Sequence, residues 1–152
     1  MAEQLGRPFL DFDTEIERRS GRSVTDIFRE HGEPHFRKLE LELTRELAAR
    51  SGMVLAPGGG WGTVPGALAL LRPPARMIYL RATPGVALER MGAERASRPL
   101  LSHADPLSEL GRLLAAREAF YRLADHVVDV DRVDLQEVIS LVSQLASAGW
   151  EG

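Results

Sequence analysis

A short apolar run that ends in three consecutive glycines constrains this chain more than any other stretch. Residues 53–56 read Met-Val-Leu-Ala, and Gly58–Gly60 follow after one proline. Apolar runs of this length are typical of strands buried on both faces, as in a parallel sheet. Glycine has no Cβ, so the three glycines can adopt left-handed angles and let a ligand contact the main chain. In open α/β sheets ligands bind outside the carboxyl ends of the strands. The pattern therefore favours a ligand site here, with a flexible turn as the alternative.

Length and composition indicate one domain over residues 1–152. A chain of 152 residues buries roughly 70% of the surface that its unfolded form exposes. The net charge of −3 argues against a nucleic-acid or membrane-surface binder, because such proteins are basic. The absence of cysteine excludes disulfide and thiolate chemistry. The sequence shows no signal-peptide pattern and no apolar run long enough to span a membrane, so we expect a cytoplasmic protein. We also expect it to be monomeric.

Two aspartates close the first predicted strand, which covers residues 8–13. Asp11 and Asp13 are two positions apart, so on a strand both carboxylates point to the same side. Such a pair at the carboxyl end of a strand suits a divalent cation or a polyol. The alternative is a helix N-cap by Asp13 or Thr14, since a helical segment follows and Gly21 ends it.

Helical and strand patterns alternate along the rest of the chain. The expected helices cover residues 14–20, 24–31, 33–50, 64–71, 84–90, 106–124 and 135–145, and the expected later strands cover residues 53–56, 76–80 and 126–130. Ser23, Thr83 and Asp134 are the expected N-caps of three of these helices. The alternation predicts an α/β fold, a parallel sheet with helices on both faces.

Arginines in the helices and in one loop suggest contact with an anion. Arg117 lies on the apolar stripe of its helix, and a buried guanidinium needs an anionic partner from the protein or from a ligand. Arg37 lies beside the buried stripe of an earlier helix. Residues 92–103 lack periodicity and are rich in arginine, including Arg98. We predict that they form a lid that closes over an anionic ligand, with a solvated connection as the alternative.

Six stretches, in their order and spacing, resemble shikimate kinase, a small member of the nucleoside-monophosphate-kinase-like P-loop family. They are residues 9–17, 21–28, 32–40, 58–60, 98–101 and 117–121. The resemblance covers nearly the whole chain and implies a P-loop kinase-like three-layer sandwich. It also implies an activity, the transfer of the γ-phosphoryl group of ATP to the 3-hydroxyl of shikimate in aromatic amino-acid biosynthesis.

The resemblance assigns the residues of a substrate pocket. Asp13 would accept hydrogen bonds from shikimate hydroxyls and orient or deprotonate the attacking one. Arg37 and Arg117 would bind the shikimate carboxylate, and the amides of Gly59 and Gly60 would complete the pocket. These residue types fit the substrate, because a carboxylate with three hydroxyls needs guanidinium groups at one end and a carboxylate acceptor at the other.

The resemblance also assigns residues to ATP and its Mg²⁺ ion. Asp11 would help to hold magnesium through water. Arg98 on the predicted lid would reach the ATP phosphates, and Arg90 would flank the adenine.

The phosphate-binding motif of the family, Gly-x-x-x-x-Gly-Lys-Ser/Thr, does not occur in this sequence. Lys38 is the only lysine and lies in a predicted helix, and Trp61 follows the three glycines where a small residue would be expected. The first strand of the family, which occupies the middle of a sheet of order 2-3-1-4-5, is missing as well. We therefore expect no ATP-dependent phosphorylation of shikimate above background by this chain. The strands at 53–56 and 76–80 must pair directly, gain a substitute strand or stay apart.

Three interpretations follow from the pattern and its missing motif. The chain can be a shikimate kinase whose given sequence starts at an internal methionine, or a non-catalytic module that binds a shikimate-type carboxylate. It can also be a kinase for another small hydroxy acid such as gluconate. We favour the first interpretation, and the combination of Asp13, Arg37 and Arg117 favours shikimate over gluconate.

Overall fold

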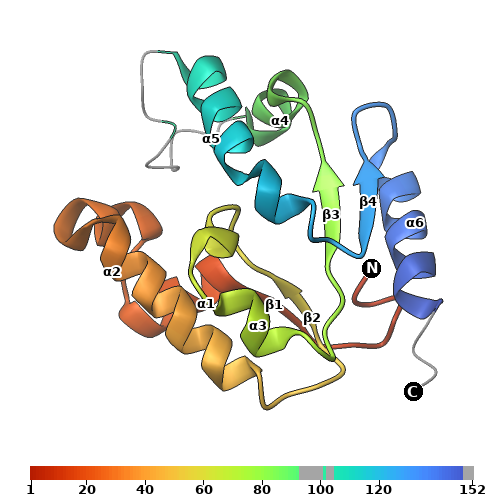
Figure 1. The fold of residues 1–152 in the computed structure, drawn as a ribbon, viewed down its shortest axis with the longest axis horizontal. Coiled ribbons are helices and arrows are strands. Elements are labelled where there is room, and N and C mark those ends of the chain that lie inside the picture. The colour runs from red at the N-terminus through yellow and green to blue at the C-terminus, as the bar shows by residue number, and fades with distance from the viewer. Residues whose placement is uncertain (93–100, 102–104, 149–152) are drawn as a thin grey trace.

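The computed structural model describes residues 1–92, 101 and 105–148, and its strands form two separate parallel pairs (Figure 1). The strands are β1 (Phe9–Asp11), β2 (Val54–Ala56), β3 (Ile78–Arg81) and β4 (His126–Asp129). β1 pairs with β2, and β3 pairs with β4. The predicted α/β class with parallel strands is confirmed. Of the three arrangements expected for β2 and β3, the structure has the one in which they stay apart.

Helices surround both strand pairs, and their bounds follow the local sequence signals closely. They are α1 (Phe12–Ser20), α2 (Val24–Leu47), the 3₁₀ turn η1 (Trp61–Thr63), α3 (Ala67–Leu71), α4 (Pro84–Met91), α5 (Pro106–Tyr121) and α6 (Leu135–Ser147). Gly32 breaks α2 with a φ of 79°, which confirms the predicted stop there, because only glycine adopts that angle easily. Most of the predicted lid, namely residues 93–100, 102 and 103, lies outside the described residues, and Arg98 is among them.

The prediction that the first strand runs to Asp13 is wrong. β1 ends at Asp11, whose side chain is the N-cap of α1 and accepts a hydrogen bond from the Thr14 N–H at 2.9 Å. Phe12, fully buried, begins the helix. The N-cap is therefore Asp11 and not Asp13 or Thr14, and Asp13 lies in the first helical turn. The two-residue alternation of a strand does not apply to the pair, because the backbone turns into a helix between them.

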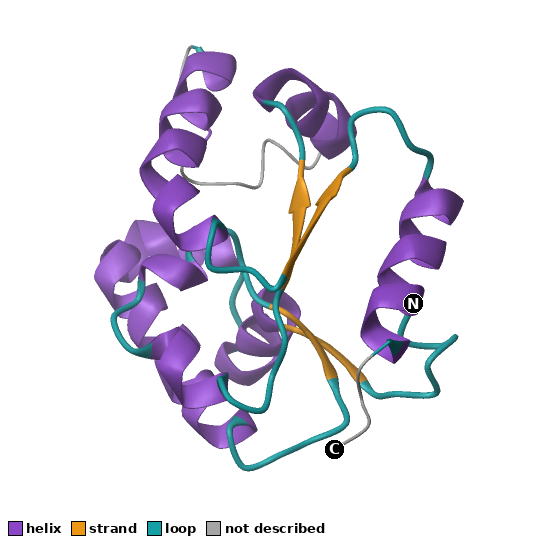
Figure 2. Ribbon diagram, turned by 45° about the vertical axis from the view of Figure 1, so that its right-hand side comes forward, coloured by secondary structure: helices purple, strands orange, loops and turns teal. Residues whose placement is uncertain are grey.

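Each strand pair has its own hydrophobic core. The core beside β1 and β2 is formed mainly by α1, α2 and the η1 turn, with Phe12, Leu43 and Trp61 among its buried residues. The core beside β4 is smaller and consists of Val128, Val130 and Val142 with partly buried neighbours. Figure 2 shows the two strand pairs as separate groups with helices around each. The space between β2 and β3 is thus bordered by both halves of the molecule.

Candidate active site

The glycine loop is fixed at the carboxyl end of β2 by the residue that follows it. Trp61 is buried, and its indole N–H donates a hydrogen bond to Thr44 Oγ1 of α2 at 2.8 Å. Its ring also meets the rings of Phe12 and Phe120 edge-on. The unexpected tryptophan therefore anchors the end of the loop to three helices, which gives Gly58–Gly60 a defined position.

Arg37 of α2 lies against Gly60. A methyl group on Gly60 would overlap the Arg37 guanidinium, so a larger residue there would require this side chain to move. The guanidinium is held by two carboxylates of the same helix, Glu33 at 2.9 Å and Glu40 at 2.7 Å. Residues three and four positions apart share a helix face, which is why these three side chains meet.

Glu40 is a fully buried carboxylate of which only one oxygen is bonded. Its Oε2 pairs with Arg37, whereas Oε1 has no hydrogen-bond partner in the described part of the chain. Oε1 and the Asp13 carboxylate lie 3.2 and 3.4 Å from the position of a methyl group built on Gly58. Burial raises the pKa of the Glu40 carboxyl, while Arg37 opposes that shift and Asp13 adds to it. Glu40 is thus a buried carboxylate that the glycine loop covers and that holds the Arg37 guanidinium in place.

Arg117 of α5 also reaches the glycine loop. Its Nη1 atom lies 3.1 Å from the position of a methyl group on Gly59. One helical turn later, the Tyr121 hydroxyl donates a hydrogen bond to the Gly59 carbonyl at 2.8 Å. Tyr121 also stacks on Tyr79 of β3, with ring centroids 4.5 Å apart. This stacking ties the loop after β2 to the second strand pair.

The structure brings together Asp13, Arg37 and Arg117 at the glycine loop, where Asp13 lies beside Gly58, Arg117 beside Gly59 and Arg37 beside Gly60. They come from α1, α2, α5 and the loop after β2, so the cluster exists only in the folded chain. Its chemistry combines two guanidinium groups, carboxylate acceptors and exposed main chain, which suits a small ligand with a carboxylate and several hydroxyls.

The remaining predicted residues lie away from this cluster. Asp11 lies at the carboxyl end of β1, where its side chain caps α1. Arg90 lies at the end of α4 and donates hydrogen bonds to the carbonyls of Val130 and Val133, beyond β4. Among the residues with assigned positions, no group of three or more His, Cys, Asp or Glu side chains forms a metal cage.

Sequence reasoning missed Glu40 and Tyr121 as members of the cluster. A signal for both existed in the helical spacing. Glu40 is three residues after Arg37, and Tyr121 is four residues after Arg117, so each shares a helix face with a predicted arginine. Periodicity gave no sign that Glu40 would be fully buried, because its burial depends on the loop that packs over it.

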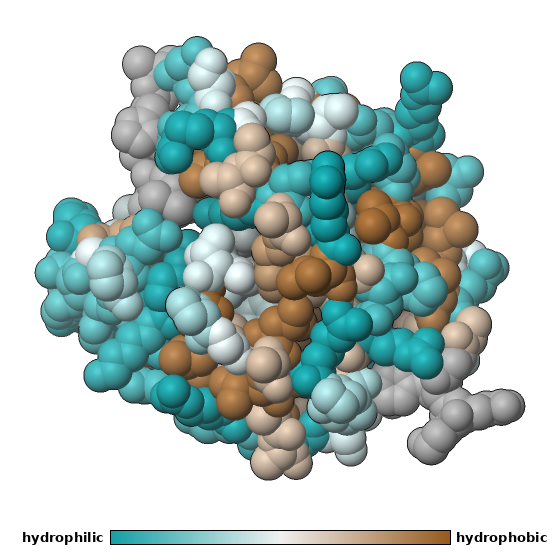
Figure 3. Space-filling model, viewed as in Figure 1, coloured by the Kyte–Doolittle hydropathy of each residue, from teal (hydrophilic) through white to brown (hydrophobic). Residues whose placement is uncertain are grey.

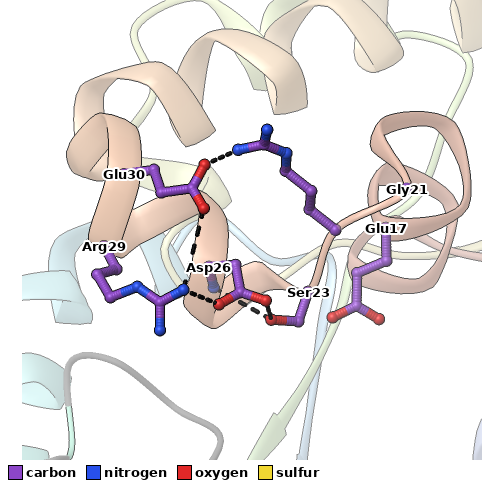
Figure 4. A pocket seen from close by; sticks show the side chains of 7 residues that line it. Glu17, Gly21, Ser23, Asp26, Arg29 and Glu30 are labelled. Atoms are coloured by element: carbon purple, nitrogen blue, oxygen red, sulfur yellow. Dashed lines mark hydrogen bonds and ion pairs between the residues drawn. The ribbon is translucent and has the colours of Figure 1, made fainter.

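Apart from this cluster, a cavity of about 440 Å³ lies on α1 and the start of α2 (Figure 4). Its lining is strongly charged, but the charges pair with one another. Asp26 binds Arg29 at 2.5 Å, and Glu30 forms an ion pair with Arg22. Since these groups satisfy each other, the cavity offers less to an anionic ligand than the cluster at the glycine loop does.

No helix within the described ranges is long and apolar enough to cross a membrane.

Comparison with known proteins identifies the family. The shikimate kinase family model matches residues 1–146. The shikimate kinase of Symbiobacterium thermophilum is 41% identical over 155 residues, which cover 100% of this chain and 89% of that protein. The shikimate kinase of Pseudomonas syringae pv. syringae is 40% identical over 96% of this chain and 86% of that protein.

Solved structures give the same answer. Shikimate kinase from Acinetobacter baumannii, in complex with shikimate, matches with a TM-score of 0.90 and 33% identity, over 99% of this chain and 84% of that one. The enzyme from Aquifex aeolicus matches with a TM-score of 0.77 and 31% identity, over 99% and 88%. The fold, the order of the site residues along the chain and these similarities lead to one conclusion: the chain belongs to the shikimate kinase family.

Proposed function

We propose that this shikimate kinase chain binds shikimate in the cluster of Asp13, Arg37, Arg117 and the Gly58–Gly60 loop. The observation that carries the proposal is the convergence of these side chains on one short stretch of bare main chain. The solved relative from Acinetobacter baumannii, which has the same fold, contains shikimate. The substrate class therefore agrees with the chemistry of the cluster.

The two guanidinium groups form the carboxylate-binding end of the proposed site. Three of the N–H groups of Arg37 bind Glu33 and Glu40, and a guanidinium carries more donors than these. The two glutamates thus orient Arg37 without using all its donors. Arg117 has no ion-pair partner within the described ranges, so a ligand carboxylate would supply the anion that the sequence pattern calls for. The N–H groups of Gly59 and Gly60 would complete this end.

The Asp13 carboxylate forms the hydroxyl-binding end. Asp13 would accept a hydrogen bond from the attacking hydroxyl and orient it or remove its proton. Glu40 is buried under the glycine loop and would contribute by holding Arg37 in place for the ligand carboxylate.

The shikimate kinase family uses ATP as phosphate donor, and residues near the cluster fit its metal ion. Mg²⁺ is usually bound through one or two carboxylates and several waters, a requirement that Asp11 with Asp13 can meet. The bound nucleotide supplies the phosphoryl group, and the metal offsets its charge. We assign Arg98 to the phosphates and Arg90 to the adenine.

Location, assembly and domain organisation complete the proposal. Shikimate and ATP are small charged molecules, the net charge of −3 argues against a nucleic-acid partner, and the given sequence has no apolar run long enough to span a membrane. We propose a cytoplasmic monomer with one domain over residues 1–152 and a lid over residues 92–103.

Calorimetric titration of the 152-residue chain with shikimate tests the proposal. Arg117→Met removes a guanidinium group and with it the N–H donors for the ligand carboxylate. Each charge-assisted hydrogen bond is worth about 1.5–3 kcal/mol. We expect the dissociation constant of shikimate to rise by about one to two decades. Arg112→Met is the matched control, because Arg112 lies on the same helix with an exposed side chain paired to Glu109.

The outcomes separate the interpretations. Shikimate binding that is lost in Arg117→Met and kept in Arg112→Met supports the pocket. Absence of shikimate binding, or an equal loss in both variants, overturns it. A coupled assay of ATP-dependent phosphorylation runs beside the titration. We expect background turnover, so robust turnover would mean that other groups hold the phosphates.

A further inference from the structure

One turn of α5 reaches the glycine loop with two side chains, of which the proposed site uses one. Arg117 Nη1 lies beside Gly59, and four residues later the Tyr121 hydroxyl donates a hydrogen bond to the Gly59 carbonyl at 2.8 Å. Residues four positions apart lie on the same helix face, so both side chains reach the loop together. Tyr121 thus makes a defined contact that the proposed function has not used.

The Tyr121 ring is fixed by aromatic contacts. It stacks on the Tyr79 ring with centroids 4.5 Å apart and meets the Phe120 ring edge-on at 5.8 Å. These three rings border a cavity among the apolar residues that gather through the middle of the molecule (Figure 3). A tyrosine placed in this way packs its apolar body and presents its hydroxyl for one specific hydrogen bond. The position of the ring therefore holds the hydroxyl at the Gly59 carbonyl.

Two carbonyls of the loop accept hydrogen bonds, and each bond sets the direction of an N–H group. The Gly58 carbonyl accepts a hydrogen bond from the Trp61 N–H at 2.9 Å. The Gly59 carbonyl accepts the hydrogen bond from Tyr121. In a planar trans peptide the N–H of the next residue points away from the carbonyl oxygen. The bond from Trp61 therefore sets the N–H of Gly59, and the bond from Tyr121 sets the N–H of Gly60.

The direction of these N–H groups matters because glycines leave the main chain free to turn. A run of glycines has more accessible backbone angles than any other sequence. Within the part of the chain that the structure describes, no group accepts a hydrogen bond from the N–H of Gly59 or Gly60, so both can donate to a ligand. An N–H group that already has its direction binds a ligand without the entropic cost of ordering the loop.

We propose that Tyr121 is a positioning residue of the candidate site, which holds the Gly59–Gly60 peptide so that its N–H faces the ligand carboxylate bound by Arg117. This role rests on the proposed function, because the carboxylate is that of shikimate. Tyr121 acts through the main chain. Its hydroxyl binds the carbonyl on one side of the peptide, and the ligand meets the N–H on the other side.

Tyr121→Phe removes the hydroxyl and keeps the ring, and Tyr79→Phe is the matched control. Each variant loses one hydroxyl from the same stacked pair, but it is the Tyr121 hydroxyl that binds the loop. Gly59 is exposed, so water can replace the hydroxyl on its carbonyl. We therefore expect both variants to fold and only Tyr121→Phe to lose the direction of the peptide.

Calorimetric titration with shikimate measures the effect on binding. The net contribution of one neutral hydrogen bond corresponds to a factor of about three to ten in an equilibrium constant. We expect Tyr121→Phe to raise the dissociation constant of shikimate by this factor and Tyr79→Phe to change it by less than about twofold. The rise is smaller than that expected for Arg117→Met, because the ligand keeps both guanidinium groups.

Nuclear magnetic resonance separates positioning from a general loss of stability. The amides of Trp61 and Thr63 bind the carbonyls of Gly58 and Gly60. In Tyr121→Phe without ligand they should exchange hydrogen at least about threefold faster, whereas the amides of α2 should keep their rates. At a saturating shikimate concentration, the shift of the Gly60 amide resonance should be smaller in Tyr121→Phe than in the wild type.

The outcomes are distinct. Equal effects of the two phenylalanine variants on binding would overturn the positioning role. Faster exchange across α2 in Tyr121→Phe would also overturn it, since Tyr121 would then support the whole fold. So would faster exchange in the loop with an unchanged dissociation constant, which would make Tyr121 a structural residue alone. If the wild-type chain binds no shikimate, the proposed function fails, and the exchange rates decide whether Tyr121 holds the loop.

Discussion

At the scale of single residues, breaking the ion pair between Arg37 and the buried Glu40 should lower the stability of the fold the most. Removing one partner of a buried ion pair leaves the other without compensation, at a cost of about 3–5 kcal/mol. We expect Glu40→Ala to lower the free energy of unfolding by an amount near the lower end of that range, because Glu33 still contacts Arg37. Urea unfolding followed by tryptophan fluorescence measures the change.

Glu33→Ala is the matched control for that variant. Glu33 binds the same guanidinium, but its side chain is 44% exposed, and exposed pairs contribute only about 0–1 kcal/mol. The prediction is contradicted if the two variants lose similar amounts of stability, which would mean that the burial of Glu40 has no energetic consequence.

At the scale of elements, the N-caps of α4 and α6 differ in a way that can be measured. Asp134 forms a full capping box with Glu137 at the start of α6, whereas the Thr83 side chain makes no capping hydrogen bond to α4. Asp134→Ala should lower the free energy of unfolding by about 1 kcal/mol. Thr83→Ala should lower it by a small fraction of that amount or leave it unchanged. Thermal unfolding by circular dichroism compares them. An equal cost would show that the bond at Asp134 adds no stability.

The last turns of α1 give the chain a stability that depends on pH. Arg18 and Arg19 hydrogen-bond to Glu15 and lower its pKa from 4.5 to about 2. A carboxyl with a lowered folded-state pKa stabilises the fold above its unfolded pKa, and this contribution is lost as the pH falls from about 4.5 to about 2. Since the arginines are exposed, we expect a contribution of no more than about 1 kcal/mol.

Glu15→Gln should therefore destabilise the protein at pH 6 and have little effect near pH 2. The measurement is the difference in urea midpoint between wild type and variant at each pH. Glu42→Gln is the control, because Glu42 faces Lys38 at the longer distance of 3.9 Å. A Glu15→Gln effect that does not shrink with falling pH would contradict the assignment.

At the scale of the whole molecule, two strand pairs with separate cores predict two cooperative units. Among the described residues, the core around α1 and α2 has eight buried residues, and the core beside β4 has three. Apolar burial is the main favourable term in folding, so the β3–β4 half should open at a lower free energy. Native-state hydrogen exchange in increasing urea should place the amides of β4 and α6 in a less stable group than those of α2. A single exchange isotherm for both halves would contradict this.

Local signals in the sequence predicted much of the fold because they act over a few residues. The stop at Gly32, the cap at Ser23 and the capping residue Asp134 depend on hydrogen bonds and backbone angles within one or two turns. The same logic failed at Asp11 and Asp13. Strand and helix patterns overlap there, and the buried Phe12 ring decides where the helix begins.

The sequence by itself determined the alternation of strands and helices, most of the helix ends and the residue types of the candidate site. Only the tertiary structure decided that Glu40 would be buried with one oxygen bare, that Tyr121 would bind the glycine loop, and that β2 and β3 would stay apart. The physical reason is the distance along the chain between the residues that interact. Caps and turns are settled by neighbours in the chain, whereas desolvation and strand pairing depend on segments that approach each other only after folding.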